Sequence, residues 1–450
     1  MEQIKALVAI ASLYLNTSLN LTSTDNVPNR FHVAPMQCYT NQPLRKLFHL
    51  LSPSSIKWTE MEKVDDIFPK TKPDDYLLAA LEKRLGSPQS YDESSNLVLQ
   101  LGSNDPDRLK SCVEYTVQRY EFKEINLNCG CPAIETGGAA TYGASLMKDP
   151  QLTWKLVDSV RKGLEDSADT AASIRPAISV KCRIGVFENV EDMRPLDDKD
   201  YQYLKNYIST IYDAGANHVI LHARPAILAG LSPVKNRIVP ELDYEFVNDI
   251  ASDFKGKVDI TLNGGIRTLS QLQSLQEESA TAAISSHMAG RWSLRRPLDL
   301  AGVEGLLNGK KLGSSPLSTR EDAVKNAIED YIDYSVKMAS VPSRQQRFTT
   351  AELCLPLYLI VEQMKDDYDF EEGNSDLDES PLLSCGEIES LYDLLQDGVA
   401  QLEDVCNSGK KKKKRNAHSD EINFKRLSSL FKSLVGAKVA NKWKRNRAEL

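Results

Sequence analysis

The sequence contains no run of about 18 uncharged apolar residues, the length that a membrane-spanning helix needs, so no membrane span is expected. It is also poor in cysteine, because eight cysteines in 450 residues are too few for a disulfide scaffold. Two of them form a Cys129-Gly130-Cys131 motif in an apolar stretch, which favours reduced thiols in a reducing compartment. With 41% hydrophobic and 26% charged residues, the composition indicates a globular protein of two or three domains, or one large barrel.

The net charge of −8 is an average over unequal parts of the chain. Residues 410–450 contain fourteen Lys and Arg against three acids, a net charge of +11, which leaves −19 for the first 409 residues. Residues 366–404 contain fourteen acids and no Lys or Arg. A basic block beside an acidic one indicates a polyanionic partner at this end of the chain.

The first 29 residues form an N-terminal extension. An apolar stretch, Ala6–Leu15, follows Lys5 and precedes a segment rich in Ser, Thr and Asn, which resembles a weak targeting segment. Glu2 and the lack of Arg before Arg30 argue against targeting. We expect a cytoplasmic protein. Residues 1–29 could still direct import into a plastid or mitochondrion. The alternatives are that they form a frayed terminus or an extra helix.

From residue 30 onward, short β-rich runs alternate with helical patterns. Most runs are almost continuously apolar, as in parallel strands that are buried on both faces. They lie at 31–35, 55–60, 97–101, 124–128, 177–182, 218–222, 258–262 and 282–288, with helical patterns at 107–120, 151–163, 200–213 and 269–277. Eight repeats in this span predict an α/β fold, a TIM (β/α)8 barrel over 30–315, with a doubly wound sheet as the alternative.

The β-signal stops near residue 316, and an α-helical C-terminal domain is expected over 316–450. Helical patterns cover 319–340, 342–364, 386–405 and 422–447. The acidic stretch 365–381 and the basic stretch 407–420 read as disordered loops.

Polar residues stand at the carboxyl end of every predicted strand, where the active sites of TIM barrels lie. A single one would read as a turn residue, but the full set indicates a catalytic mouth. The set comprises Met36, Gln37, Glu60, Gln100, Asn126, Asn128, Lys181, Arg183, His222, Arg224, Asn263–Gly265, Gly290 and Arg291.

Two of these segments fit a phosphate, and three of the strand ends fit a flavin. Asn263-Gly264-Gly265 and Gly290-Arg291 follow strands seven and eight, the common phosphate site of TIM barrels. Lys181 stands in an apolar run and needs an anionic partner, which a reduced flavin would supply. Gln100 could bond the ring edge, and His222 could bond the ring or the phosphate.

Cys131 lies on a loop beside the predicted barrel mouth, before Pro132. A cysteine in that place can act as a proton donor or as a nucleophile. Cys129 competes for the role, but its position at the strand end favours a packed side chain.

These residues together resemble the tRNA-dihydrouridine synthases, and within them the A-type subfamily. The resemblance covers about 30–310 and is weaker at 318–340 and 422–447. Its motifs are Ala34-Pro35-Met36, Leu99-Gln100-Leu101-Gly102, Asn126-Leu127-Asn128-Cys129-Gly130-Cys131-Pro132, Tyr142-Gly143-Ala144, Val180-Lys181-Cys182-Arg183-Ile184-Gly185, His222-Ala223-Arg224, and Gly230–Arg237 followed by Pro240–Tyr244.

The resemblance implies an FMN-dependent TIM barrel with a helical domain that helps to hold tRNA, NADPH as reductant, and uridines 20 and 20a as targets. It implies hydride transfer from the flavin to C6 of uracil and a proton from Cys131 to C5. Cofactor contacts would come from Ala34, Pro35, Met36, Gln100, Lys181, His222, Asn263, Gly264, Gly265, Gly290 and Arg291. Substrate contacts would come from Asn128, Arg183, Arg224 and Arg237. No metal and no obligate protein partner are expected.

Against this pattern, 342–420 reads as a charged insertion, and His287 is an unusual residue that we interpret as buried and satisfied. Two other functions stay open. One is an FMN barrel that reduces a free pyrimidine, and the other is a tRNA-binding protein without catalysis. The basic tail and the Gly230–Arg237 loop argue against the first, and intact Cys131 and Lys181 argue against the second.

Overall fold

The computed structural model describes residues 30–68, 81–82, 84–86, 96–132, 142–167, 175–311, 317–341, 348–371 and 383–408. The expectations for the extension 1–29, for the basic tail 410–450 and for a helix over 422–447 lie outside these residues.

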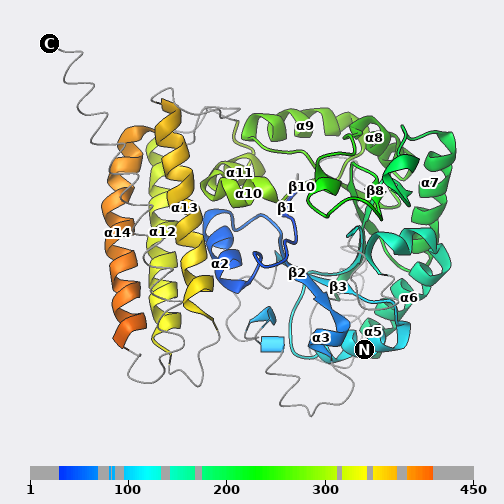
Figure 1. Cartoon of the computed structure of the whole chain (residues 1–450), viewed down its shortest axis with the longest axis horizontal. Helices are drawn as coiled ribbons and strands as arrows, with labels where there is room; N and C mark the ends of the chain where they lie inside the picture. Colours follow the sequence, from blue (N-terminus) through cyan, green and yellow to red (C-terminus); the bar gives the residue numbers. More distant parts are fainter. Residues whose placement is uncertain are drawn as a thin grey trace, which may run out of the picture.

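Eight parallel strands form a closed barrel (Figure 1). They pair in chain order, β2-β3-β4-β5-β7-β9-β10-β1. The last gap is closed where Val33 N donates to Ile56 O (2.9 Å) and Ile56 N donates to Phe31 O (2.8 Å). This ring confirms the predicted TIM barrel and excludes the doubly wound sheet. The strands are β1 Arg30–Val33, β2 Lys57–Lys63, β3 Leu97–Gly102, β4 Glu124–Cys129, β5 Ala177–Arg183, β7 His218–His222, β9 Asp259–Asn263 and β10 Ser286–Ala289.

Alternate residues of each strand pack into two different cores, because side chains alternate across a strand. Leu99 and Leu101 of β3 belong to the large core between strands and helices. Val98, on the opposite face of the same strand, belongs to a separate small cluster inside the barrel with Trp58, Ile220 and Met288. Burial on both faces explains why the strands read as continuous apolar runs.

Helices follow the strands and surround the barrel (Figure 1). Asp105 and Asp149 cap helices that begin with proline, since each carboxylate accepts a backbone N–H of the first turn. The barrel helices are α2 Gln42–Leu51, α3 Val64–Ile67, α5 Pro106–Val117, α6 Pro150–Asp166, α7 Asp198–Asp213, α8 Tyr244–Asp253, α9 Leu269–Ala282, α10 Arg291–Arg295 and α11 Leu300–Leu307, with the 3₁₀ turns η3 Gly143–Lys148, η4 Val190–Asp192, η5 Lys235–Arg237 and η6 Pro297–Asp299.

The largest difference between the predicted and observed strand boundaries is at the start of the last strand. The predicted strand 282–288 begins only at Ser286, because α9 continues to Ala282 and Ala283 then takes a left-handed conformation with φ 59°. A short alanine-rich run is compatible with helix and strand alike, and the sequence pattern alone does not separate them.

Three long helices lie beside the barrel and confirm the helical C-terminal region (Figure 1). They are α12 Leu317–Ala339, α13 Thr350–Glu371 and α14 Cys385–Ser408, and α12 and α13 both contact α2 of the barrel. In the described part of the chain, no helix is both long enough and apolar enough to cross a membrane.

The start of the predicted acidic loop 365–381 was also wrong, because α13 continues through Glu371. Asp367 is fully buried there, and its carboxylate accepts a hydrogen bond from Arg296 Nη1 (2.6 Å). Gln363 of the same helix donates to Asp299 (2.9 Å). A charge that reads as solvent-exposed in the sequence is thus a docking contact between α13 and the barrel.

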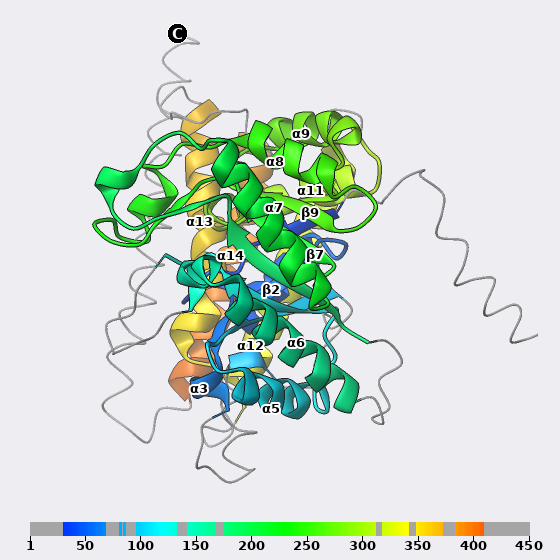
Figure 2. The ribbon, with the colours of Figure 1, turned by 90° about the vertical axis from the view of Figure 1, so that its right-hand side faces the viewer.

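A second, two-stranded parallel sheet joins the loops that follow β5 and β7, and the sequence did not predict it. Its strands are β6 Val186–Phe187 and β8 Ala226–Ile227. The buried Asn236 side chain holds the loop after β8 against this small sheet. Its Oδ1 accepts from Ile227 N (2.7 Å), and its Nδ2 donates to Ile227 O (2.9 Å). These green loops project to one side of the barrel (Figure 2).

Candidate active site

The polar residues at the strand ends meet at one mouth of the barrel. Asn128 lies opposite Lys181, Arg183 opposite His222, and His222 opposite Asn263 in the parallel register. Because the strands run the same way, these side chains lie at neighbouring levels of the carboxyl end. The structure therefore brings together the candidate residues of β4, β5, β7 and β9.

Cys131 is a half-buried thiol on a tightly held loop. Asn128 Oδ1 accepts hydrogen bonds from Gly130 N (3.1 Å) and Cys131 N (3.0 Å). On the other side, Cys131 O accepts from Ala144 N (2.8 Å). Gly143 has φ +80°, and a Cβ on it would lie 2.5 Å from Cys131 O, so only glycine permits this approach.

Cys129 is fully buried, as its strand-end position predicted. Burial raises the pKa of its thiol to about 12, so the thiolate is not accessible at neutral pH. The two sulfurs of the motif thus have different environments, since Cys129 is buried and Cys131 is partly exposed.

Gln100 and Asn128 are linked to each other rather than free. Asn128 Nδ2 donates to Gln100 Oε1 (2.9 Å), and Gln100 Nε2 donates to Asn126 Oδ1 (2.8 Å). All three side chains are buried. Asn128 therefore positions the Cys131 loop in this structure, and its predicted contact with substrate stays a prediction.

Lys181 and Arg183 make the mouth electropositive, and His222 lies beside them. Lys181 is half-buried, and burial followed by the nearby Arg183 lowers its pKa to about 8. Burial, Arg183 and Lys181 hold the pKa of His222 well below its ordinary value, so the imidazole is neutral at pH 7. No described carboxylate forms an ion pair with Lys181. A bound anion would relieve the repulsion between these groups.

Gly264 and Gly265 lie where a side chain could not. Both have positive φ, +115° and +76°. A Cβ on Gly264 would lie 2.6 Å from His222 Cδ2, and a Cβ on Gly265 would lie 2.3 Å from Leu242 Cδ1. Tyr244 Oη donates to Gly264 O (2.6 Å), and Asn263 Nδ2 donates to Met288 O (2.9 Å). The segment is rigid and presents backbone beside His222.

The segments that follow β1 and β10 border each other in the same way. A Cβ on Gly290 would lie 3.1 Å from both Ala34 Cβ and Met36 Sδ, which places Ala34-Pro35-Met36 against Gly290. Arg291 follows, and its Nη2 donates to Arg237 O (3.3 Å). Burial, Arg237, Arg267 and Arg224 lower the pKa of Arg291, the signature of a crowded cationic site.

Arg183 connects three loops. It is only 3% exposed, and it donates to Gly130 O (3.0 Å), Pro225 O (3.1 Å) and Asn236 O (3.2 Å). Burial lowers its pKa to about 10. These bonds tie the Cys131 loop to the loops after β7, so a direct contact of Arg183 with substrate stays a prediction.

Arg224 and Arg237 each retain an unused donor. Arg224 Nη1 donates to Pro240 O and, at 3.4 Å, to Ile238 O, whereas its Nε has no partner among the described residues. The buried Nε of Arg237 likewise has none in the described part of the chain. An unpaired buried donor requires an acceptor that the described residues do not supply, such as an ordered water or a bound group.

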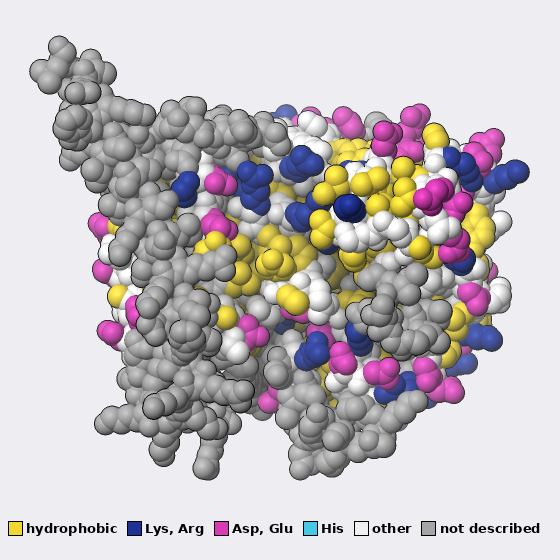
Figure 3. All heavy atoms as spheres, in the orientation of Figure 1, with side chains coloured by type: hydrophobic (Ala, Val, Ile, Leu, Met, Phe, Trp, Pro, Cys, Tyr) yellow, Lys and Arg dark blue, Asp and Glu magenta, His cyan; other side chains and the backbone are white. Residues whose placement is uncertain are grey.

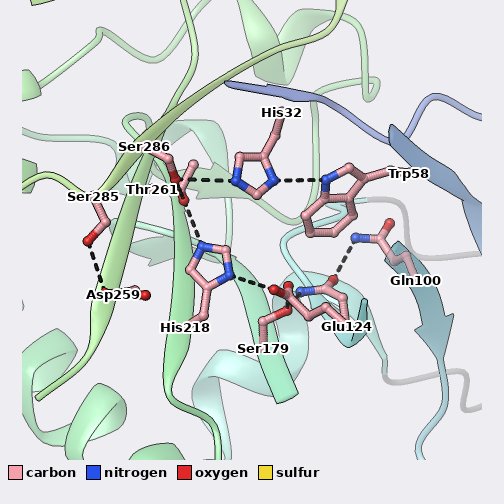
Figure 4. Close-up of polar contacts among 11 residues, drawn as sticks. His32, Trp58, Gln100, Glu124, Ser179, His218, Asp259, Thr261, Ser285 and Ser286 are labelled. Carbon is pink, nitrogen blue, oxygen red and sulfur yellow. Dashed lines mark hydrogen bonds and ion pairs between the residues drawn. The ribbon is translucent and has the colours of Figure 1, made fainter. Parts of the chain in front are cut away.

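A polar network inside the barrel was missed by reasoning from strand ends (Figure 4). Its members lie deeper, on the inward faces of the strands, and they include His32, Glu124, Ser179, His218, Thr261 and Ser286. The available signal was a buried acid and a histidine at the starts of β4 and β7, because charges there need partners. His287, in contrast, is fully buried as predicted.

Fold and site together define a TIM-barrel enzyme with a cysteine loop and a cationic mouth. A family model described as "Dihydrouridine synthase (Dus)" matches residues 32–355. The chain belongs to this family, and it is an oxidoreductase of this class.

Curated relatives support the same placement, and each is named tRNA-dihydrouridine(20/20a) synthase. The Shewanella oneidensis protein is 30% identical over 318 residues, which is 70% of this chain and 81% of that protein. The Xanthomonas campestris pv. campestris protein is 33% identical over 67% of this chain and 77% of its own length. The Escherichia coli K12 protein is 33% identical over 68% and 76%. The family resemblance deduced from the motifs is therefore confirmed.

Proposed function

We propose that this protein reduces the C5–C6 bond of D-loop uridines 20 and 20a in tRNA to dihydrouridine, with FMN as cofactor and NADPH as reductant. The observation that carries the proposal is Cys131, a half-buried thiol fixed by backbone hydrogen bonds at a cationic barrel mouth. The relatives named for positions 20 and 20a support the choice of tRNA and of these uridines.

The residues at the mouth fit a flavin mononucleotide. Lys181 lacks a described anionic partner and would stabilise negative charge on the ring. Gln100 and His222 would contact the ring edge, with Ala34-Pro35-Met36 beside it. The phosphate would lie on Asn263-Gly264-Gly265, Gly290 and Arg291, where backbone can approach an anion and cations are crowded. When bound, FMN with NADPH as reductant would provide the hydride chemistry at C6 of the uracil.

The chain's own residues carry the rest of the reaction. The Cys131 thiol would hold the proton that C5 receives, on the side of the base away from the cofactor. Asn128 and Ala144 hold the Cys131 backbone in place through its N–H and its carbonyl oxygen. Arg183 ties this loop to those after β7, and Arg224 and Arg237 offer unused donors toward the base and its phosphates.

A uridine inside folded tRNA must leave its stack to reach such a mouth. The loop around η5 carries Lys235 and Arg237 with the exposed apolar residues Val234 and Ile238, a surface suited to phosphates and bases. Figure 3 shows Lys and Arg side chains around apolar surface on one face of the molecule. The basic segment 410–450 adds fourteen cations. We propose 30–315 as the catalytic barrel and 316–450 as the RNA-binding domain.

The decisive experiment combines a spectrum with a substrate comparison. The purified protein should be yellow with a flavin absorption band, should oxidise NADPH, and should form dihydrouridine in transcribed tRNA but not from free uridine. Activity on free uridine would favour the free-pyrimidine alternative. A colourless protein that binds tRNA would favour the non-catalytic one. Mapping dihydrouridine in tRNA from cells that lack the protein would identify the positions.

A further inference from the structure

A continuous chain of hydrogen bonds runs from the core of the barrel to the Cys131 loop. At its inner end, Glu124 Oε2 lies 2.9 Å from His218 Nδ1, and Glu124 Oε1 accepts from Ser179 Oγ. Asn126 Nδ2 donates to Ser179 Oγ (2.7 Å). From there the chain continues through Gln100 to Asn128, and ends at the backbone N–H groups of Gly130 and Cys131. Figure 4 shows the inner part of this chain.

The direction of every bond follows from the chemistry of Glu124. An ionised carboxylate has no proton, so both of its oxygens accept. Ser179 must therefore give its single hydroxyl proton to Glu124, which leaves its oxygen to accept from Asn126. Asn126 is then fixed with its amide nitrogen inward and its oxygen toward Gln100.

The same logic continues outward. Gln100 spends its amide nitrogen on Asn126 Oδ1, so its oxygen accepts from Asn128 Nδ2. The oxygen of Asn128 is consequently the atom that faces the loop, where it accepts from two successive backbone N–H groups. A reversed Asn128 would place its own N–H donors against those of Gly130 and Cys131, and the loop would lose both bonds.

Glu124 is well placed to keep its charge. It is buried at the start of β4, and burial alone would raise its pKa. The attraction and hydrogen bond of His218, the Ser179 hydroxyl and Lys123 outweigh burial, so the pKa lies below its ordinary value. Beyond Glu124, His218 Nε2 bonds to Thr261 Oγ1 (2.7 Å), so the histidine is held as well.

We propose that Glu124 is a positioning residue, which as the terminal acceptor of this chain fixes the orientation of the Gln100 and Asn128 amides and thereby the loop that presents Cys131. The claim that this orientation assists catalysis rests on the proposed function. The direction of the hydrogen bonds does not depend on it. Glu124 touches neither the mouth nor the thiol, and it acts through Ser179 and the three amides.

Two serine variants test the proposal as a matched pair. Ser179→Ala removes the link between Glu124 and Asn126. Ser286→Ala removes a hydroxyl of the same network on the far side, where Ser286 Oγ bonds to His32 Nε2 (3.3 Å). Both serines lie in barrel strands and are buried, 0% and 2% exposed, so the two substitutions carry a similar packing cost.

The first readout is the alkylation rate of Cys131 by iodoacetamide in the purified full chain, followed by peptide mass spectrometry with the exposed Cys38 as internal reference. Ser179→Ala should raise the Cys131 rate by about fivefold, the factor expected for one lost hydrogen bond that held the loop. Ser286→Ala should leave it unchanged. The second readout is the steady-state reaction with tRNA, in which Ser179→Ala should lower kcat and leave the tRNA KM unchanged.

Equal alkylation rates in the two variants would overturn the proposal, whatever their thermal stabilities. Glu124→Gln should behave like Ser179→Ala, but it also breaks the contact with His218, so the serine pair is decisive. A wild-type protein without flavin or tRNA activity, whose Cys131 still responds to Ser179→Ala, would uphold the positioning role and refute the proposed function. Normal wild-type activity together with a Cys131 rate that Ser179→Ala does not change would refute the positioning role and uphold the proposed function.

Discussion

Arg296 of the barrel and Asp367 of α13 form a buried ion pair, with Nη1 2.6 Å from Oδ1 across 71 residues of the chain. Arg296 also donates through Nε to Asp299 (2.8 Å), and Trp292 Nε1 donates to the same oxygen (2.8 Å). The contact lies directly after α10, which follows Gly290 of the candidate phosphate site. The helical region is thus anchored next to the barrel mouth.

We expect Asp367→Ala to destabilise the protein by about 1–3 kcal/mol, because Arg296 loses one of its two buried carboxylate partners and keeps only Asp299. Asp366→Ala is the matched control. Its pair with Arg295 spans 3.8 Å between largely exposed side chains, and such pairs are worth about 0–1 kcal/mol. Urea unfolding of both variants measures the difference. Equal losses would mean that α13 docks through its apolar face alone.

Cys131→Ala should retain FMN and accept electrons from NADPH, yet lose about 10²–10⁴-fold in the rate of uridine reduction, the usual contribution of a general acid. Cys129→Ala should be much milder in rate, since this sulfur is buried away from the mouth. Rapid-mixing measurements of flavin reduction and of flavin reoxidation by tRNA separate the two steps. The same loss at both positions would indicate a structural motif.

FMN affinity should fall as pH rises above about 8. The pKa of Lys181 is lowered to about 8 in the free protein, so the lysine is charged below that pH and neutral above it. An anionic ligand binds the charged form, and above pH 8 each bound molecule must bring a proton with it. The dissociation constant should then rise by up to about tenfold per pH unit. Fluorescence titration of the flavin-free protein from pH 6.5 to pH 9.5 measures it.

Lys181→Arg provides the control for this pH dependence, because a guanidinium stays charged throughout the range. Its FMN dissociation constant should be flat above pH 8, even where its absolute affinity differs. A wild-type profile that is equally flat would remove Lys181 from the flavin site.

Gly265→Ala should lower both FMN content and thermal stability. Its φ is +76°, and the added Cβ would meet Leu242 at 2.3 Å and Tyr244 Oη at 2.7 Å. Gly256→Ala is a close control, because Gly256 has the same φ of +76° and open space around its Cβ position. Gly256→Ala should lower the free energy of unfolding by only about 1–2 kcal/mol, the cost of a left-handed conformation for a residue with a Cβ. Equal FMN occupancy in both variants would mean that the turn at Gly265 is not part of the cofactor site.

Deletion of 421–450 should raise the apparent tRNA KM strongly and flatten its dependence on salt, because each phosphate contact releases counterions. NADPH oxidation by the bound flavin should stay near normal. Neutralising only the Lys410–Arg415 run should have a smaller effect. Unchanged tRNA binding and an unchanged salt slope would assign RNA binding to the barrel alone.

The barrel, its strand order and the candidate mouth could be predicted from the sequence because they depend on local pattern. Apolar runs of strand length separated by helical periods specify parallel strands, and the polar residue that ends each run is placed at the mouth by chain direction alone. Cys131, Lys181, His222 and Asn263–Gly265 all follow from this rule, and their motifs carried the family resemblance as well.

Tertiary structure alone decided which polar groups become partners. Nothing in the sequence distinguishes Asp367 from its neighbour Asp366. Asp367 is nevertheless buried against Arg296, whereas Asp366 is partly exposed, because only docking of α13 determines which side of the helix meets the barrel. Glu124 and Asn128 lie four residues apart on one strand, and their link passes through Ser179, Asn126 and Gln100 on three strands. Such a chain exists only when β3, β4 and β5 pair in this register, since hydrogen-bond direction is a property of neighbours in space and not of neighbours in sequence.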